Sequence, residues 1–367
     1  MQVAELMNIK SYFAEKLSKL LFLEIKKENI RKIFNVLLKE DIYIPINSKY
    51  IVDSIKLQDN LDKIPMTYFI EGMFYVLGAD EQFRFNKYYK KIIFKDKNNN
   101  KFIKSIIGKN VKSKNYEEAY IILKGLSQIE DTLEIYDKLI IMADEIRKKN
   151  IIFKEEELNI LQKAKLKDNY ALPYLYEAII KKEERDYERA LFCINNYIVK
   201  GGEETLEVTD MKQWLKSCVN YDRGKELLES NPLEALKYLI PLIDVLGNNA
   251  SIYYYIAVGY RMVNNHEKAI YYLNEALNID SSLVEVVNEM GINYASLGNY
   301  EGAIAYLRKA FEATRSVEIC TNLILCYLNS GNLKDAKIHL EIAKKLEPKD
   351  QVVVELEGII NKTVDRN

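Results

Sequence analysis

The sequence is poor in residues that interrupt helices and in residues that perform most enzyme chemistry. Its 367 residues include only 14 Gly and 6 Pro, which favours helices over the many turns of a β sandwich. The two histidines, His266 and His339, have no partner at metal-ligand spacing. The HExxH zinc motif, the glycine-rich nucleotide loops and the GxSxG nucleophile motif are absent. We therefore expect a non-catalytic protein with no metal and no cofactor.

Cysteine, net charge and long apolar runs are scarce as well. Cys193, Cys218, Cys320 and Cys326 form no CxxC pair and are too sparse for a disulfide scaffold, so we expect reduced, mostly buried thiols. A formal net charge of −1 gives no global field to attract nucleic acid or a membrane. No apolar run of about 18 residues occurs, and the first residues lack the apolar core of a signal peptide. We expect a cytoplasmic protein, and the abundance of Lys, Ile, Asn and Tyr is typical of an AT-rich bacterial genome.

The sequence instead contains a motif that repeats about every 34 residues, called the repeat phrase below. The clearest copies, NNHEKAIYYLNEAL, GNYEGAIAYLRKAF and GNLKDAKIHLEIAK, begin at Asn264, Gly298 and Gly331. Each has a central alanine, a leucine four positions later and a small residue three positions after that, and a fourth stripe lies upstream. The stripes are Ala235, Leu239 and Leu242; Ala269, Leu273 and Ala276; Ala303, Leu307 and Ala310; and Ala336, Leu340 and Ala343. Steps of four and three place these side chains on one helical face, where small residues let a second helix approach closely.

A helix with its own apolar stripe precedes each phrase. These stripes end in Tyr260, Tyr294 and Tyr327. The Gly and Asn residues between the two helices favour the left-handed conformation that ends a helix. Pro348 follows the last phrase, where one helix must stop before another begins. Each copy is therefore predicted to be a helical hairpin.

This pattern resembles the tetratricopeptide repeat (TPR) family. The matching positions are the small residues Ala257 and Gly291, the tyrosines that follow them, the central alanines and Pro348, whereas Ile324 replaces a small residue. The resemblance implies an all-α fold, a TPR-type α-α superhelix that winds as a right-handed solenoid. It also implies a protein that binds other proteins or peptides.

The hairpins predict how the chain is organised. We expect a regular TPR array over residues 216–350 and a C-terminal capping helix with a short tail over 351–367. Fainter copies of the phrase centre on Ala119 and Ala190, which indicates divergent TPR-like hairpins over 98–215.

The remaining segments carry no repeat phrase. Residues 1–97 are predicted to be a helical N-terminal unit, with helices over 11–25 and 49–57. Pro45 interrupts the one strand-like run and favours an extended connection there. Residues 201–210 are acidic and begin with two glycines, so we expect a loop that breaks the array.

The resemblance also implies where a partner binds. The first helix of each TPR hairpin lines a concave groove that can hold a peptide or a partner helix. The groove residues expected from this geometry are Tyr254, Val258, Arg261, Glu285, Asn288, Ile292, Thr321 and Leu325.

Some TPR proteins hold an acidic C-terminal tail with a clamp of Lys, Asn and Arg. The corresponding positions here are Tyr254, Val258, Glu289, Glu318 and Asn322. None of these is a cation and two are acidic, so like charge opposes a carboxylate ligand. A receptor for acidic tails is therefore disfavoured.

A basic segment lies outside the regular array. From Arg84 to Lys114 there are eleven Lys and Arg against one acidic residue, Asp96, and aromatic residues are interleaved. One interpretation is a surface for nucleic-acid phosphates or anionic lipid. The other, which we favour because no RNA-binding or helix-turn-helix pattern accompanies the charge, is a solvated helix face. The candidate basic surface is Arg84, Lys87, Lys90, Lys91, Lys95 and Lys101.

Taken together, the residues favour a non-catalytic adaptor or scaffold that binds a protein or peptide in the TPR groove. The alternative is a regulator whose repeats sense a short signal peptide and whose N-terminal unit contacts DNA or a target protein.

Overall fold

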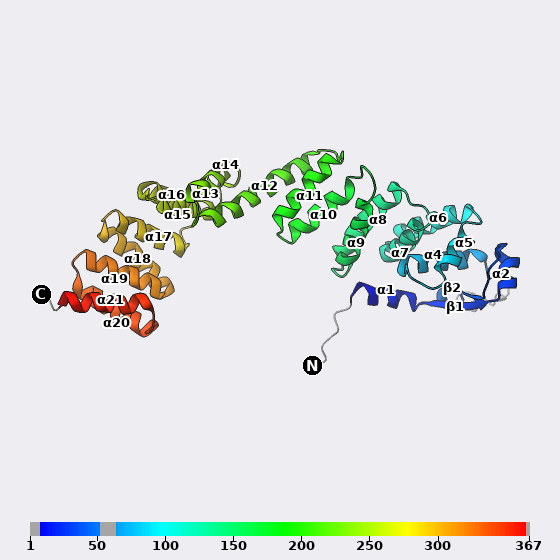
Figure 1. Ribbon diagram of the computed structural model, residues 1–367, viewed down its shortest axis with the longest axis horizontal. Coiled ribbons are helices and arrows are strands. Elements are labelled where there is room, and N and C mark those ends of the chain that lie inside the picture. Colours follow the sequence, from blue (N-terminus) through cyan, green and yellow to red (C-terminus); the bar gives the residue numbers. More distant parts are fainter. Residues whose placement is uncertain (1–7, 52–63, 365–367) are drawn as a thin grey trace. The chain divides into compact units, whose positions relative to one another are not determined.

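The computed structural model describes residues 8–51 and 64–364 (Figure 1). The chain divides into two compact units, residues 1–212 and 213–367. Among the described residues, no helix is long and apolar enough to cross a membrane.

The first unit is helical apart from one pair of strands. Its elements are α1 (Ile9–Leu17), β1 (Leu20–Ile25), α2 (Lys27–Phe34), β2 (Ile42–Asn47), α4 (Met66–Ala79), α5 (Asn86–Ile93), α6 (Asn98–Lys112), α7 (Tyr116–Ser127), α8 (Leu133–Arg147), α9 (Phe153–Lys165), α10 (Leu172–Glu183) and α11 (Tyr187–Val199). α12 (Leu206–Leu227) contains the boundary between the units.

The second unit is built from helical hairpins. Its elements are α13 (Pro232–Leu239), α14 (Leu242–Leu246), α15 (Ala250–Met262), α16 (His266–Ile279), α17 (Val284–Ser296), α18 (Tyr300–Thr314), α19 (Val317–Asn329), α20 (Leu333–Leu346) and α21 (Gln351–Val364). The all-α, TPR-type fold is confirmed, and α21 lies where the capping helix was predicted.

The N-terminal residues depart from the helical prediction. The helix expected over 11–25 ends at Leu17, and β1 follows it and pairs antiparallel with β2. Pro45 lies inside β2 and not in a connection. Within residues 8–51 and 64–364, β1 is the only strand neighbour of β2, so the edge position tolerates the missing N–H of Pro45.

The register of β2 explains why a strand forms here. Ile42, Ile44 and Ile46 alternate along the strand and are fully buried, which is the period of a half-buried strand. β2 packs on α4, where Gly72 has no Cβ to collide with the carbonyl oxygen of Pro45. Of the helix expected over 49–57, residues 52–57 lie outside the described residues.

Residues 201–210 also differ from the prediction of a loop. α12 begins at Leu206, and the Thr205 hydroxyl oxygen accepts a hydrogen bond from the Val208 backbone N–H at 3.4 Å. Thr205 therefore starts the helix as an N-cap, and only the residues before it lack helical structure.

One turn geometry recurs between paired helices in both units. At Gly298, φ is 77°, and the Gly298 N–H bonds to the Ala295 carbonyl at 2.9 Å. The next N–H, that of Asn299, bonds to the Tyr294 carbonyl at 3.0 Å, and the Asn299 side chain then caps α18. This is a Schellman ending followed directly by an N-cap. The same left-handed position and backbone bonds occur at Lys114, Arg185, Asn264 and Gly331.

The core of the second unit follows the repeated stripes. The four central alanines, Ala235, Ala269, Ala303 and Ala336, have no exposed surface. The three hairpins from α15 to α20 each carry a ring pair as well. Tyr260 and Tyr272 stack with centroids 5.5 Å apart, and Tyr294 and Tyr306 do the same. In the next hairpin the pair is Tyr327 and His339, at 5.0 Å. His339 therefore occupies a packing position of the repeat.

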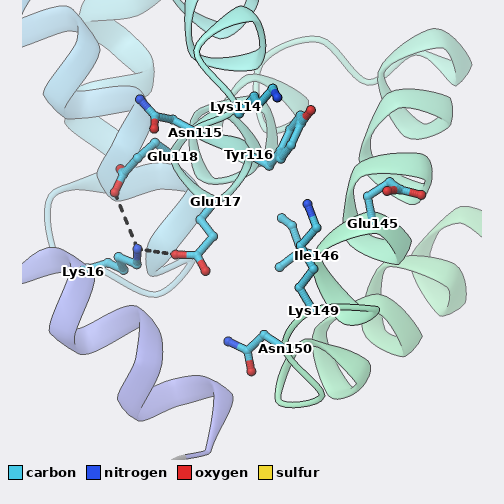
Figure 2. Close-up of a pocket in the computed structure, with 10 residues that line it drawn as sticks. All are labelled: Lys16, Lys114, Asn115, Tyr116, Glu117, Glu118, Glu145, Ile146, Lys149 and Asn150. Atoms are coloured by element: carbon cyan, nitrogen blue, oxygen red, sulfur yellow. Dashed lines mark hydrogen bonds and ion pairs between the residues drawn. The ribbon is translucent and has the colours of Figure 1, made fainter.

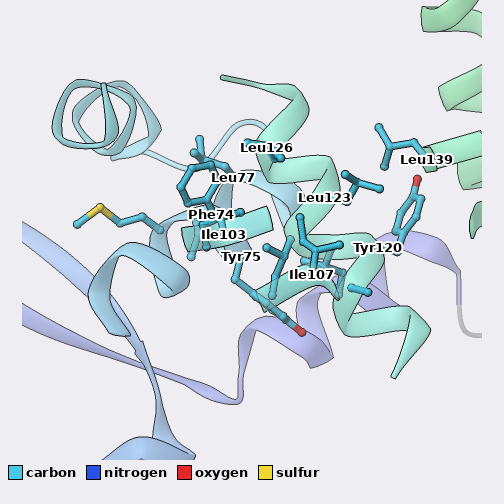
Figure 3. Packing of buried hydrophobic residues seen from close by; sticks show 14 of the residues in the cluster. Phe74, Tyr75, Leu77, Ile103, Ile107, Tyr120, Leu123, Leu126 and Leu139 are labelled. Carbon is cyan, nitrogen blue, oxygen red and sulfur yellow. The ribbon is translucent and has the colours of Figure 1, made fainter. Parts of the chain in front are cut away.

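The core of the first unit centres on the crossing of α4 and α7 (Figure 3). Phe74, Leu77 and Tyr120 are fully buried there. Gly78 in α4 and Gly125 in α7 lie at the contact, where a Cβ on either would overlap a backbone carbonyl of the other helix. The two helices therefore approach backbone to backbone, which only glycine permits.

Replacing Gly125 by Ala tests this crossing. The new methyl would overlap the Phe74 carbonyl oxygen, so we expect the free energy of unfolding to fall by about 1–3 kcal/mol. Gly108→Ala is the matched control, because a Cβ on that helical glycine meets nothing within 4 Å. We expect it to gain about 0.5–1 kcal/mol. Urea unfolding followed by circular dichroism measures both, and equal effects would contradict the backbone contact.

A buried ionic cluster joins α8, α9 and α10. Arg147, only 4% exposed, donates from Nε to Glu157 at 2.6 Å and from Nη2 to Asp144 at 2.7 Å, and it also pairs with Glu183. One arginine therefore faces three carboxylates. Burial raises the pKa of Glu157 to about 7, although Arg147 acts in the opposite direction.

This raised pKa predicts a pH dependence of stability. Between the ordinary glutamate pKa and about 7, the folded state holds a proton that the unfolded state has lost. The stabilisation is therefore complete at about pH 4 and is lost as pH rises to about 7, by on the order of 1–3 kcal/mol. Urea unfolding across this range should show the loss in the wild type and not in Glu157→Gln. If the free energy of unfolding changed with pH in the same way in both proteins, the pH dependence could not be assigned to Glu157.

Candidate partner-binding face

Three first helices of the second unit lie next to one another. α15 contacts α17, and α17 contacts α19. We define the first-helix face as the predicted groove residues that keep exposed surface: Tyr254, Val258, Arg261, Glu285, Asn288, Ile292 and Leu325.

Exposure differs along this face. Glu285 and Leu325 are exposed, the latter by 40%, and the other members are half-buried. Thr321 departs from the prediction. It is only 5% exposed, and its hydroxyl donates to the Glu318 carbonyl at 2.8 Å. Its hydroxyl is therefore used within α19 and does not form part of the surface.

An ion pair links two of the helices. Arg261 Nε in α15 donates to Glu289 Oε2 in α17 at 2.7 Å. Glu289 is almost buried, and this burial raises its pKa while Arg261 lowers it. Arg261 was predicted to face the groove, and the structure shows that its Nε pairs with a carboxylate while its side chain stays 28% exposed. The cation is thus part of the scaffold of the face.

Tyrosines flank this ion pair. Tyr254 meets Tyr255 edge to face with centroids 5.1 Å apart, and Tyr255 meets Tyr221 of α12 at 5.7 Å. Lys225 Nζ lies 5.2 Å from the Tyr221 ring and 5.1 Å from the Tyr255 ring. Of these aromatic residues, Tyr254 alone was predicted to line the groove, although the run of three tyrosines at 253–255 was a visible signal.

The charges near Tyr254 are mainly negative. Burial raises the pKa of Tyr254 to about 12, and the nearby carboxylates of Glu289 and Glu285 add to the shift. The Tyr254 hydroxyl therefore stays protonated at neutral pH and can donate a hydrogen bond. Asn288 has hydrogen-bonding capacity left as well, because its Oδ1 is buried without a partner among the described residues.

The two histidines serve the fold. His266 Nδ1 lies 3.0 Å from Asn293 Oδ1, and Asn293 Nδ2 donates to the Glu289 carbonyl at 2.8 Å. His339 Nδ1 donates to the Asp335 carbonyl at 2.9 Å. Within residues 8–51 and 64–364, no group of three or more His, Cys, Asp or Glu could hold a metal ion.

The cysteines lie in or near the core. Cys193, Cys320 and Cys326 are buried and Cys218 is half-buried, and none of the four forms a disulfide. Burial raises the pKa of the Cys320 and Cys326 thiols to about 11, so both are protonated at neutral pH.

The basic surface predicted in the first unit is partly used within the fold. Arg84 pairs with Glu40 at 3.3 Å, Lys87 lies over the Tyr88 ring, and Lys90 donates to Gln128 at 2.9 Å. Lys91, Lys95 and Lys101 are exposed. Arg84 and Lys87 are exposed as well, so of this set only Lys90 is half-buried.

A polar hollow in the first unit lies between α1, α7 and α8 (Figure 2). Lys16 of α1 forms ion pairs there with Glu117 and Glu118 of α7. Lys149 Nζ lies 5.1 Å from the Tyr116 ring centre. The ion pairs of Lys16 tie α1 to α7.

The ion pair of the first-helix face can be tested by a double-mutant cycle. Arg261→Ala leaves the Glu289 carboxylate buried without its cation, and we expect a loss of about 1–3 kcal/mol in the free energy of unfolding. Adding Glu289→Gln removes the unpaired charge, so the double variant should recover part of that loss. Urea unfolding measures each variant, and additive losses would show that the pair is not coupled.

Comparison with known proteins identifies one repeat directly. The tetratricopeptide repeat family model matches residues 284–316, which contain α17 and α18. No match is found among curated proteins.

Solved structures of similar fold share little sequence with the chain. MamA is 18% identical, and the match covers 49% of this chain and 92% of MamA with a TM-score of 0.37. YrrB, a TPR protein, is 16% identical, with 54% and 96% covered and a TM-score of 0.40. TTC0263, a TPR protein of Thermus thermophilus, is 20% identical, with 53% and 98% covered and a TM-score of 0.32. The family match thus identifies one tetratricopeptide repeat in the chain, at α17 and α18. The same turn geometry recurs in the helical hairpins on both sides of it.

Proposed function

We propose that the chain is a non-catalytic adaptor that binds a protein or peptide on the first-helix face. The observation that carries this proposal is a set of aromatic and aliphatic side chains on three adjacent helices that keep exposed surface. Tyr254, Ile292 and Leu325 belong to it. Tyrosine is enriched among the interface residues that contribute most to binding energy, and exposed aliphatic surface is stabilised when a partner buries it.

The charge of the face favours one class of peptide. Glu285 and Glu318 are exposed, and the nearby cation Arg261 is paired with Glu289. A carboxylate ligand would meet like charge, whereas a lysine or arginine could pair with these glutamates. A basic or neutral peptide segment therefore fits the face better than an acidic tail.

Paired substitutions on the two sides of the hairpins test this function. Tyr254→Ala with Leu325→Ser removes exposed apolar surface from first helices α15 and α19. Tyr271→Ala with Ile338→Ser makes the same changes on second helices α16 and α20, where the side chains are 59% and 48% exposed. Arg261 is left intact, because its loss would disturb Glu289.

The measurement is affinity capture from an extract of the source cells, with quantitative mass spectrometry of the bound proteins. A partner captured by the wild type and by the control pair, but reduced about tenfold by Tyr254→Ala with Leu325→Ser, would support the proposal; that factor corresponds to about 1.4 kcal/mol. Equal capture by the two double variants would show that the partner binds outside the first-helix face. Retention of nucleic acid alone would favour the regulator alternative.

A further inference from the structure

The first unit carries an apolar groove that its own helices do not cover. It lies between α6, α7 and α8 and has a volume of about 470 Å³. Aliphatic side chains from all three helices line it, among them Ile107 and Val111 of α6, Leu123 of α7 and Ile141 of α8. Val111 is 36% exposed and Ile141 is 48% exposed. The groove therefore exposes apolar surface that burial against a partner would stabilise.

Gly108 keeps the middle of the groove open. It lies in the C-terminal half of α6 and lines the groove, and a Cβ placed on it would meet nothing within 4 Å. Glycine costs a helix about 1 kcal/mol relative to alanine. No internal packing contact requires glycine here, in contrast to Gly78 and Gly125, which lie against backbone. Because Gly108 has no side chain, it leaves room in the groove for a partner chain.

Lysines predominate beside the groove. Lys104 and Lys138 line it, and Glu145, which lines it too, pairs with Lys148 at 2.9 Å. α6 contains four lysines and no acidic residue. Lys101, Lys104, Gly108 and Lys112 follow one another at steps of three, four and four, so the lysines lie along the edge that faces the opening. Lys104 pairs with Glu130 at 2.6 Å, whereas Lys101 and Lys112 are exposed and form no ion pair with the described residues.

Nucleic acid fits this surface less well than a peptide does. Single strands bind through basic grooves in which bases stack on aromatic rings. The apolar lining of the groove is mainly aliphatic, with Tyr116 as its one aromatic residue. Of the aromatic residues of the basic segment, Phe85 and Tyr89 are buried, and Phe94, which is 61% exposed, does not line the groove. Aliphatic side chains of a peptide complement such a lining.

We propose that the groove binds an acidic amphipathic helix of a partner protein. Aliphatic side chains on one face of that helix would cover Val111 and Ile141, and its carboxylates would pair with Lys101 and Lys112. This arrangement follows the helix-in-groove mode of recognition. The site lies in the first unit and does not depend on the first-helix face or on its partner.

The test uses the full chain and a designed helical peptide labelled with fluorescein. The peptide carries leucines at helical spacing and glutamates elsewhere. A second peptide replaces each glutamate by lysine, and a third scrambles the first so that its leucines no longer share a face. In fluorescence anisotropy, we expect the acidic amphipathic peptide to bind at least about tenfold more tightly than either control, and less tightly as salt is added.

Gly108→Phe should fill the groove and weaken binding by about tenfold or more. Gly358→Phe is the matched control, because Gly358 is also a helical glycine with nothing within 4 Å of its Cβ position. Lys101→Glu with Lys112→Glu should lower the affinity for the acidic peptide and raise the affinity for the basic peptide. The same charge changes at the exposed Lys32 and Lys39 should leave affinity unchanged.

Three results would overturn the proposal. One is no preference for the acidic amphipathic peptide over its scrambled form. Another is equal affinity for Gly108→Phe and Gly358→Phe, with circular dichroism confirming that both fold. The third is that single-stranded nucleic acid binds more tightly than the peptide, with an affinity that falls when the lysines are replaced and is unchanged by Gly108→Phe. That result would assign the surface to nucleic acid.

Discussion

Close approach of helices at small residues is the constraint on which the rest of the structure depends. In the second unit, a Cβ on Gly291 would lie 2.5 Å from Leu307 Cγ, so the first helix of that hairpin presses directly on the leucine of the second. The central alanine Ala303 is fully buried beside it. In the first unit the α4–α7 crossing needs glycine on both helices. The helix crossings bury the apolar stripes. A partner can therefore contact only the side chains that remain exposed on the helices.

Those remaining side chains differ in charge between the two units. In the second unit, Glu285 and Glu318 are exposed and the Arg261 guanidinium is neutralised by Glu289. In the first, Lys101 and Lys112 flank an apolar groove without an acidic partner among the described residues. Charge of opposite sign steers different partners and rejects the wrong one by repulsion. Two such surfaces would let one chain hold two dissimilar segments, which is the property of an adaptor.

Much of the repeat architecture could be predicted from sequence, because its causes are local. The 34-residue period, the alanine stripes and the glycines and asparagines of the turns each act over a few residues, and the turn at Gly298 has the left-handed geometry expected. Two other features depend on contacts between distant residues. β1 forms only because β2 lies antiparallel to it against α4. The Arg261 guanidinium is committed because Glu289, one hairpin later, is buried within reach.

The central claim is that partners bind the side of the hairpins that carries Leu325. Site-specific photo-cross-linking tests it most directly, with p-benzoylphenylalanine placed at position 325 or at position 338. Leu325 and Ile338 are both exposed, on first helix α19 and second helix α20. We predict a discrete protein adduct from position 325 in living cells and none from position 338. Adducts of equal yield from both positions, or from 338 alone, would contradict the account.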